Sequence, residues 1–250
     1  MPVAARIQSM AIRGCRWAAA WLVVLAVAGS ASAQEREPGL GPDIPPPPPP
    51  LTILVVGDSI AHDLGIGLTQ ALASYPQVTV VNEGRAISGL VREDFLNWQT
   101  ELPALLNRQP VDAVVVSIGM NDRQAITEGG QIYDRFTDAW AALYEERARA
   151  LMEAATSRGI PTIWLGMPTA RNHTFHNDMA TINEIFVRAV AAEPDVSYLS
   201  MWDLTADANG NYVESGRATD GMHLSVSGVS MVVAAIRREL SRRLGVALIN

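Results

Sequence analysis

From Leu51 onward, short apolar runs rich in β-branched residues alternate with longer stretches whose apolar residues recur at helical spacing. Continuous apolar runs are typical of strands that are buried on both faces, and a helix is the usual connection between two parallel strands. The alternation therefore predicts an α/β fold, with a central parallel sheet of about five strands between two helical layers. The predicted strands are residues 52–56, 78–82, 113–118, 162–165 and 196–200.

Helices are predicted in the stretches between and after these strands, at residues 65–74, 90–106, 134–158, 177–192 and 227–244. The sequence Gly159-Ile160-Pro161 ends the third helix and begins the fourth strand, because glycine and proline both interrupt a helix. A chain of 250 residues has room for one α/β domain with a single core. We therefore assign residues 51–250 to one domain.

The first 33 residues have the layout of a secretory signal peptide. A basic start without acidic residues is followed by the apolar stretch 17–28 and by the small residues Ala31-Ser32-Ala33. We predict cleavage after Ala33 and export to the periplasm or the outside, with no membrane span left in the mature chain. An uncleaved anchor stays open as an alternative, because the uncharged stretch 17–34 is close to the shortest length that spans a bilayer.

Residues 34–50 are predicted to form a linker that is rich in proline and ends in six consecutive prolines, residues 45–50. A polyproline helix rises about 3.1 Å per residue, so this run is a semi-rigid spacer of roughly 19 Å. A ligand for a proline-recognising domain is the alternative interpretation.

Composition excludes several classes of function. All 19 basic residues are arginines against 26 acidic residues, and the net charge falls from −7 to −10 when the three arginines of residues 1–33 are removed. No basic cluster suited to a phosphate backbone is present, so we expect no nucleic-acid partner.

The absence of lysine excludes Schiff-base chemistry, a Ser-Lys dyad and a phosphate-loop lysine. The single cysteine, Cys15, lies in the signal segment, which excludes thiol catalysis and cysteine-bound metals from the mature chain.

Four polar stretches lie where the ends of the predicted strands should meet. Three of them directly follow the first three strands, and the fourth precedes the last helix. In a parallel sheet of this kind, sites form at the carboxyl ends of the strands. We therefore expect one site that contains Gly57-Asp58-Ser59, Ser88-Gly89, Gly119-Met120-Asn121-Asp122 and Asp220-Gly221-Met222-His223.

These residue types suit nucleophilic catalysis by a serine. A serine hydroxyl becomes a good nucleophile when an imidazole takes its proton, and a carboxylate then fixes the imidazole and stabilises its charged form. We predict Ser59 as the nucleophile, His223 as the base and Asp220 as the carboxylate, because a turn over three residues can bring Asp220 to Nδ1 of His223. The predicted oxyanion hole consists of the backbone N–H groups of Ser59 and Gly89 and the side-chain amide of Asn121.

In this order, the four stretches resemble the sequence blocks of the SGNH hydrolases, also called the GDSL family. Their Ser, Gly, Asn and His correspond to Ser59, Gly89, Asn121 and His223, with Ile60 in place of the leucine of the name. The segments "IGMNDRQ" and "TDGMHLSVSG" are similar to a secreted bacterial group without assigned substrates. The resemblance implies a flavodoxin-like three-layer α/β/α sandwich and ester or acyl-transfer chemistry that needs no metal or other cofactor.

The resulting hypothesis is a secreted serine esterase that acts through an acyl-enzyme. It removes a short acyl group, above all acetyl, from a saccharide or related ester. Two alternatives stay open. The first is an O-acyltransferase with the same triad, in which a sugar hydroxyl replaces water. The second is a non-catalytic saccharide-binding domain. The sequence does not define the oligomeric state.

Other polar residues are expected near the same edge of the sheet. Arg123 and Arg171 follow the third and fourth strands and are candidates for binding a carboxylate of the substrate, with structural ion pairs as the alternative. We interpret Asp58 and Asp122 as acceptors for backbone N–H groups that orient the loops, rather than as the carboxylate pair of a glycosidase. His62 is expected at the surface.

Overall fold

The computed structural model describes residues 49–249, so the predicted signal peptide (1–33) and nearly all of the predicted linker (34–50) lie outside the described residues. The described domain contains a parallel sheet of five strands in the order β2-β1-β3-β6-β7. This is the flavodoxin-like strand order. The strands are β1 (Leu51–Gly57), β2 (Val78–Gly84), β3 (Ala113–Ser117), β6 (Thr162–Gly166) and β7 (Val196–Ser200), each within two residues of its predicted range.

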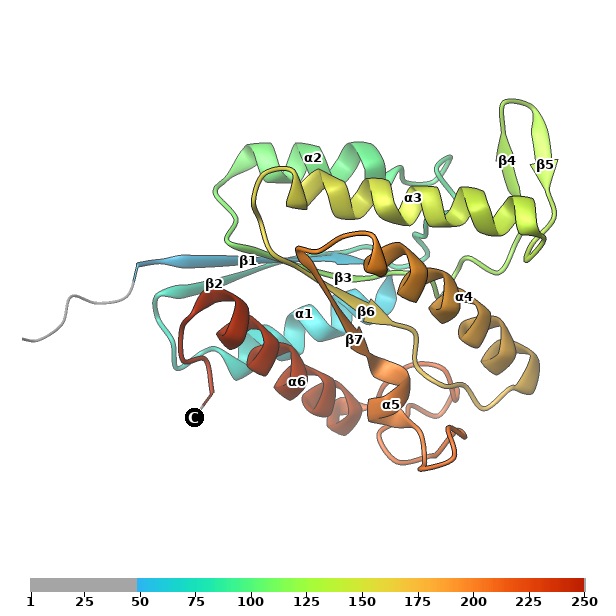
Figure 1. The fold of residues 1–250 in the computed structure, drawn as a ribbon. Coiled ribbons are helices and arrows are strands. Elements are labelled where there is room, and N and C mark those ends of the chain that lie inside the picture. The colour runs from blue at the N-terminus through green and yellow to red at the C-terminus, as the bar shows by residue number, and fades with distance from the viewer. Residues whose placement is uncertain (1–48, 250) are drawn as a thin grey trace, which may run out of the picture. The chain divides into compact units, whose positions relative to one another are not determined.

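Helices cover both faces of the sheet (Figure 1). On one face α1 (Ser59–Ala71) packs against α6 (Val226–Leu244), and on the other α3 (Asp138–Thr156) packs between α2 (Trp98–Arg108) and α4 (His173–Ala191). The short helix α5 (Met201–Thr205) directly follows β7. The predicted three-layer α/β/α sandwich is therefore confirmed. Among the helices of residues 49–249, none combines the length and the apolar character needed to cross a bilayer.

The central strands are buried as their apolar sequences predict. Every residue of β3 and β6 is buried, whereas the edge strands β2 and β7 are mostly half-buried. The chain runs from β1 outward to β2 and then back across β1 to β3. Such a change of direction opens a crevice at the carboxyl ends of β1 and β3, which is where α/β sheets bind their ligands.

The predicted helix at residues 90–106 is wrong in its first half. The helix begins at Trp98, because the side chain of Asn97 caps it by accepting hydrogen bonds from the N–H groups of Gln99 and Thr100 at 2.9 and 3.2 Å. Residues 90–96 form a loop instead. Helix α1, in contrast, begins six residues earlier than predicted, at Ser59, and is capped by Asp58.

A β-hairpin that the sequence analysis did not predict follows β3. Strands β4 (Ile126–Glu128) and β5 (Gln131–Tyr133) are antiparallel and are separate from the main sheet. Their turn consists of Gly129 and Gly130, both with positive φ (58° and 81°), a conformation that glycine adopts without strain.

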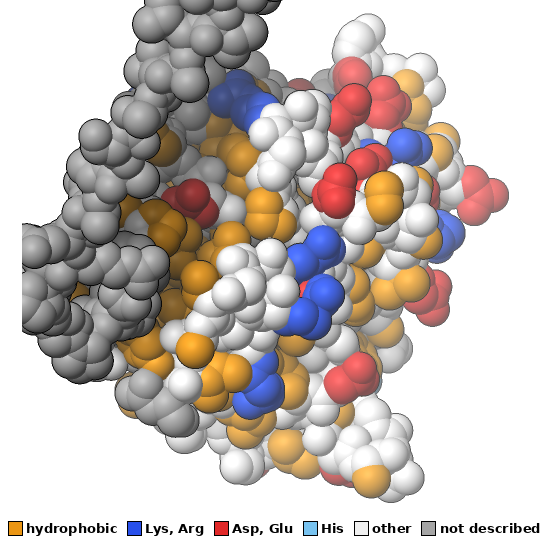
Figure 2. Space-filling model, turned by 60° about the vertical axis from the view of Figure 1, so that its left-hand side comes forward, with side chains coloured by type: hydrophobic (Ala, Val, Ile, Leu, Met, Phe, Trp, Pro, Cys, Tyr) orange, Lys and Arg blue, Asp and Glu red, His pale blue; other side chains and the backbone are white. Residues whose placement is uncertain are grey.

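Charged side chains of both signs are interspersed on the face that Figure 2 shows. Many of the exposed arginines pair with nearby carboxylates, for example Arg92 with Asp94 at 2.7 Å and Arg188 with Glu145 at 3.0 Å. Each exposed pair of this kind contributes little to stability, because water screens it.

Candidate active site

Ser59, His223 and Asp220 form a continuous series of hydrogen bonds. The Oγ atom of Ser59 lies 2.8 Å from Nε2 of His223, and Nδ1 of His223 lies 2.7 Å from Oδ2 of Asp220. The other carboxylate oxygen of Asp220 accepts the N–H groups of Met222 and His223 at 2.8 and 3.0 Å. One oxygen thus anchors Asp220 to its own loop while the other faces the imidazole.

The surroundings of Asp220 keep its carboxyl group ionised. Its partial burial acts to raise the pKa, but the hydrogen bonds from Met222 and His223 outweigh this, and the pKa of Asp220 lies below its ordinary value. An ionised carboxylate at Nδ1 stabilises a positive charge on the imidazole. The arrangement therefore favours transfer of a proton from Ser59 to His223.

The turn between β1 and α1 places Ser59 at the first position of a helix. Gly57 has a φ of 132°, and a Cβ atom there would lie 1.7 Å from the carbonyl oxygen of Ser117 on the neighbouring strand, so the turn requires glycine. The N–H of Asp58 donates to that same carbonyl at 2.9 Å. As the first residue of α1, Ser59 has a backbone N–H without a helical acceptor, which leaves it available to a ligand.

The buried carboxylate of Asp58 binds two loops together. It accepts the N–H of Ile60 at 3.0 Å, and those of Gly119 and Met120 at 3.1 and 3.0 Å. Burial raises the pKa of Asp58 to about 7, although these hydrogen bonds oppose the rise. As predicted, Asp58 orients backbone N–H groups and joins the loop after β1 to the loop after β3.

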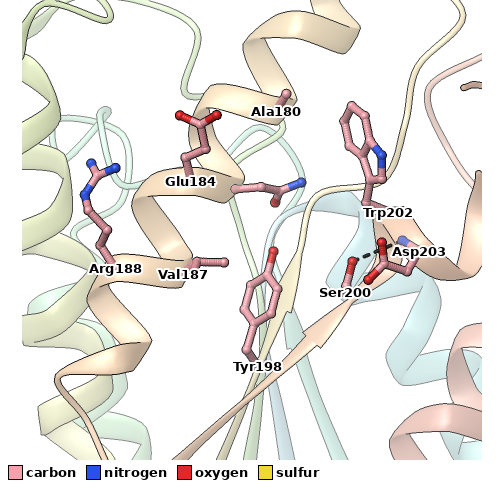
Figure 3. A pocket seen from close by; sticks show the side chains of 9 residues that line it. Ala180, Glu184, Val187, Arg188, Tyr198, Ser200, Trp202 and Asp203 are labelled. Carbon is pink, nitrogen blue, oxygen red and sulfur yellow. Dashed lines mark hydrogen bonds between the residues drawn. The ribbon is translucent and has the colours of Figure 1, made fainter. Parts of the chain in front are cut away.

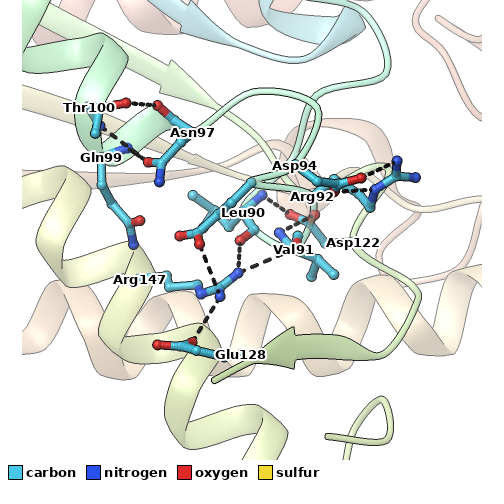
Figure 4. A network of polar contacts seen from close by, with 11 residues as sticks. Leu90, Val91, Arg92, Asp94, Asn97, Gln99, Thr100, Asp122, Glu128 and Arg147 are labelled. Atoms are coloured by element: carbon cyan, nitrogen blue, oxygen red, sulfur yellow. Dashed lines mark hydrogen bonds and ion pairs between the residues drawn. The ribbon is translucent and has the colours of Figure 1, made fainter. Parts of the chain in front are cut away.

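Asp122 has the same role for the loop after β2 (Figure 4). Its two oxygens accept the N–H groups of Leu90 and Val91 at 2.9 and 3.0 Å, and the hydroxyl of Tyr144 donates to it at 2.8 Å. Burial raises the pKa of Asp122, and these donors together with the nearby Arg147 oppose the rise. Asp122 is fully buried. If its carboxylate were removed, water could not replace it as the acceptor for these three donors.

Arg147 supports this loop from α3 (Figure 4). Its guanidinium group donates to the carbonyl oxygen of Leu90 at 2.7 Å and pairs with Glu128 and Glu93 at 2.9 and 3.4 Å. The sequence analysis missed Arg147, because one arginine in an amphipathic helix carries no local signal of burial.

The predicted oxyanion donors Gly89 and Asn121 lie on neighbouring loops. The Nδ2 group of Asn121 donates to the carbonyl oxygen of Ser88 at 2.9 Å, which links the loop after β3 to the loop after β2. A Cβ atom on Gly89 would lie 2.0 Å from Oδ1 of Asp122, so the buried carboxylate itself requires glycine at this position. The amide of Asn121 has a second N–H, which this contact does not use.

Both arginines that were predicted near the mouth of the site have partners within the protein. Arg123 donates to Asp178 at 2.7 Å and lies over the ring of Phe175 at 4.2 Å from its centroid. Arg171 pairs with both carboxylate oxygens of Glu214 at 2.9 and 2.7 Å and donates to the carbonyl of Thr219 at 2.9 Å. Their geometry is that of structural ion pairs, the alternative that the sequence left open.

The loop that carries Asp220 and His223, residues 214–225, is called here the histidine loop. Arg217 is 7% exposed and donates to the carbonyl of Thr169 at 2.6 Å, to the hydroxyl of Thr205 at 3.0 Å and to the carbonyl of Met222 at 3.4 Å. Burial lowers the pKa of Arg217 to about 10. The sequence analysis missed this residue, which ties the histidine loop to the ends of β6 and α5.

A separate hollow of about 770 Å³ lies between α4, β7 and α5 (Figure 3). Glu184 and Arg188 of α4 form one side, and Tyr198 of β7 and Trp202 of α5 form the other. None of the predicted catalytic residues lines it. His62 is exposed, as expected. Within residues 49–249, no cluster of three or more His, Cys, Asp or Glu side chains is arranged to hold a metal ion.

Comparison with known families gives one match. The model of a family described as "Protein of unknown function (DUF459)" matches residues 52–239. No curated protein matches the chain.

Several solved structures are similar in fold. The structure of TesA is 18% identical, with a TM-score of 0.57 over 77% of this chain and 99% of its own. Axe2, an acetylxylan esterase from Geobacillus stearothermophilus, is 20% identical, with a TM-score of 0.56 over 81% of this chain and 97% of its own. A protein from Desulfitobacterium hafniense DCB-2, assigned to the lipolytic G-D-S-L family, is 17% identical, with a TM-score of 0.56 over 75% of this chain and 98% of its own.

Proposed function

The chain belongs to the DUF459 family of proteins of unknown function, and we propose that it is a serine ester hydrolase of the SGNH type. The observation that carries the proposal is the hydrogen-bonded series Ser59, His223 and Asp220, with contacts of 2.8 and 2.7 Å at the carboxyl ends of the strands. A nucleophile, a base and an orienting carboxylate in this geometry are the parts that acyl transfer requires.

In the proposed reaction, Oγ of Ser59 attacks the carbonyl carbon of the ester while Nε2 of His223 takes the hydroxyl proton. The negative charge that develops on the carbonyl oxygen is stabilised by the N–H groups of Ser59 and Gly89 and by the free amide N–H of Asn121. His223 then returns the proton to the leaving alcohol, which departs and leaves an acyl group on Ser59. Water, activated by the same imidazole, hydrolyses this acyl-enzyme and restores the serine.

We further propose that the substrate is a short acyl ester, above all an acetyl ester, of a saccharide or related alcohol. The exported protein would encounter this substrate in the periplasm or outside the cell. Two observations support this substrate class. The sequence of residues 1–33 predicts export from the cytoplasm, and the similar folds include an acetylxylan esterase and a lipolytic protein.

The proposal is tested with acetyl to octanoyl model esters, using protein purified from a host that exports it. Ser59→Ala should lower kcat by about 10⁴-fold or more, because losing a triad residue removes the covalent path. Mass spectrometry of rapidly quenched wild-type protein should find the acyl group on the peptide that contains Ser59.

The matched control is Ser74→Ala, which changes an exposed serine in the turn after α1 and should leave turnover unchanged. Full turnover in Ser59→Ala would overturn the assignment. Products that carry the acyl group on an added saccharide would instead favour the O-acyltransferase. Saccharide binding that survives Ser59→Ala, without any acyl release, would favour the binding domain.

A further inference from the structure

Ile87 has an unusual conformation beside the predicted oxyanion hole. Its φ is 72°, and its side chain is 67% exposed. The N–H of Ser88 donates to the carbonyl of Arg85 at 3.1 Å, so residues 85–88 form a tight turn with Ile87 in third position. A positive φ at that position favours glycine or asparagine, because the branched Cβ of isoleucine crowds the backbone.

The fold does not require isoleucine at position 87. A glycine would adopt this turn without strain, and a polar side chain would be better suited to an exposed position. Strained backbone of this kind is concentrated at functional sites, where binding or catalysis, rather than folding, determines which residue is present. Ile87 lies two residues before Gly89, whose N–H is a proposed oxyanion donor, so the requirement is expected to come from the substrate.

The same turn forms one wall of a small hollow. The hollow has a volume of about 360 Å³, and its surface is mostly apolar. Phe95, which also lines the hollow, is 52% exposed, although it is a large apolar side chain. The residues that line the hollow are His62, Gly84, Arg85, Ala86, Phe95 and Leu96.

The hollow lies next to the predicted nucleophile. His62 follows Ser59 by three residues on α1, and residues at this spacing lie on the same side of a helix, one turn apart. The end of β2 approaches α1 closely at the hollow, because a Cβ atom on Gly84 would lie 2.3 Å from the backbone nitrogen of His62. Through His62, the hollow therefore lies one helical turn along α1 from Ser59.

We propose that this hollow binds the acyl chain of the substrate and that Ile87 forms its apolar rim. The inference rests on the proposed esterase function and extends its acyl group from acetyl to chains of about four to eight carbons. The carbonyl oxygen points to the N–H of Gly89, and the chain runs over Ala86 toward Phe95. The charge of Arg85 is paired with Glu83, so the hollow offers no free cation and suits a neutral hydrocarbon chain.

The experiment measures kcat/KM of the exported protein for esters of one alcohol with acetyl, butanoyl, hexanoyl and octanoyl groups. Each methylene group that enters the hollow should raise kcat/KM by about fourfold until the hollow is filled, because that is the effect of burying one methylene. Ala86→Phe, which fills the hollow, should lower the octanoyl-to-acetyl ratio at least about tenfold. Ile87→Gly should also lower the ratio, while the removal of strain raises Tm.

The matched control is Ile132→Gly in β5, since Ile132 is also 67% exposed but lies on the separate hairpin. It should leave the octanoyl-to-acetyl ratio unchanged. A flat chain-length profile, or a ratio that Ala86→Phe does not alter, would overturn the acyl site while Ser59-dependent hydrolysis still supports the esterase. If the folded wild-type protein hydrolysed none of these esters, both proposals would fall together.

Discussion

The two sides of the candidate site are held in place by opposite chemistry. On the Ser59 side, the buried carboxylates of Asp58 and Asp122 accept hydrogen bonds from backbone N–H groups. On the side of the histidine loop, the guanidinium group of Arg171 donates to a backbone carbonyl of this loop, and that of Arg217, within the loop, donates to the carbonyl of Thr169. Carboxylates accept hydrogen bonds from backbone N–H groups on one side, and guanidinium groups donate to backbone C=O groups on the other.

The two sides also differ in burial, and this difference indicates what each contributes. Asp58 and Asp122 are fully buried and Arg217 is buried as well, whereas Asp220 and Arg171 are exposed and His223 is half-buried. Removing a buried acceptor leaves its donors unsatisfied, which costs stability, whereas groups near the surface can turn to water. We therefore expect changes on the Ser59 side to unfold the domain and changes on the histidine loop to misalign the catalytic groups.

The largest effect is expected from Asp122→Ala. This change removes the acceptor of two backbone N–H groups and of the Tyr144 hydroxyl, and it opens a cavity. The free energy of unfolding should fall by about 4 kcal/mol, measured by urea denaturation. Asp94→Ala, which removes an exposed acid from the loop that Asp122 holds, is the control and should have no measurable effect. Equal stability of the two variants would contradict a structural role for the buried carboxylate.

A smaller loss of stability, together with a clear loss of activity, is expected from Arg217→Met. The methionine retains most of the apolar length of the side chain but cannot hold Thr169 and Met222, so the imidazole loses its alignment with Ser59. We expect kcat to fall by about 10²-fold with KM little changed, and Arg217→Lys to recover part of the loss.

The control for Arg217 is Arg171→Met, which removes an exposed ion pair with Glu214 of the same loop. It should cost no more than about fivefold in kcat/KM. A similar loss in both variants, or a drop in Tm that accounts for the lost activity of Arg217→Met, would remove the proposed distinction between the two arginines.

The smallest expected effect is a pH dependence of stability that Asp58 causes. Its pKa is raised by burial from 3.8 to about 7, so between these values the folded chain binds one proton more than the unfolded chain. The free energy of unfolding should therefore decrease as pH rises from 5 to 7.5, by on the order of 2 kcal/mol from this residue.

The variant Asp58→Asn isolates this contribution, because it cannot titrate at that position. The pKa of His176 is lowered, mainly by burial, and gives a slope of the opposite sign, but it does so in both proteins and cancels in the difference. Urea denaturation at several pH values should give a more negative slope for the wild type than for Asp58→Asn. Equal slopes would mean that Asp58 is ionised across this range.

The strands and their order could be predicted because buried parallel strands leave continuous apolar runs, and glycine and proline mark their ends. The polar stretches at the strand ends were also recognisable, since Ser59, Asn121 and His223 lie in short local motifs. The helix start at Ser59 could have been found as well, because an aspartate directly before a helix is a common N-cap.

Other parts of the site have no local signal. Leu90 and Val91 look like the start of a helix, but Asp122 binds their N–H groups from a loop far along the chain. Arg147 and Arg217 resemble ordinary surface arginines until the fold buries them. Each of these cases is decided by a tertiary contact, which overrides the local preference of the sequence.

The separation of Ser59 from His223 along the chain has a consequence for biosynthesis. The two side chains are 2.8 Å apart but 164 residues apart in sequence, and α1 and α6, which follow them, pack against each other. A chain emerging from the ribosome therefore carries its serine long before the histidine has been made. Ser59 stays unreactive until translation is nearly complete and the two ends of the domain have packed together. Such an enzyme therefore needs no separate mechanism that keeps it inactive during synthesis.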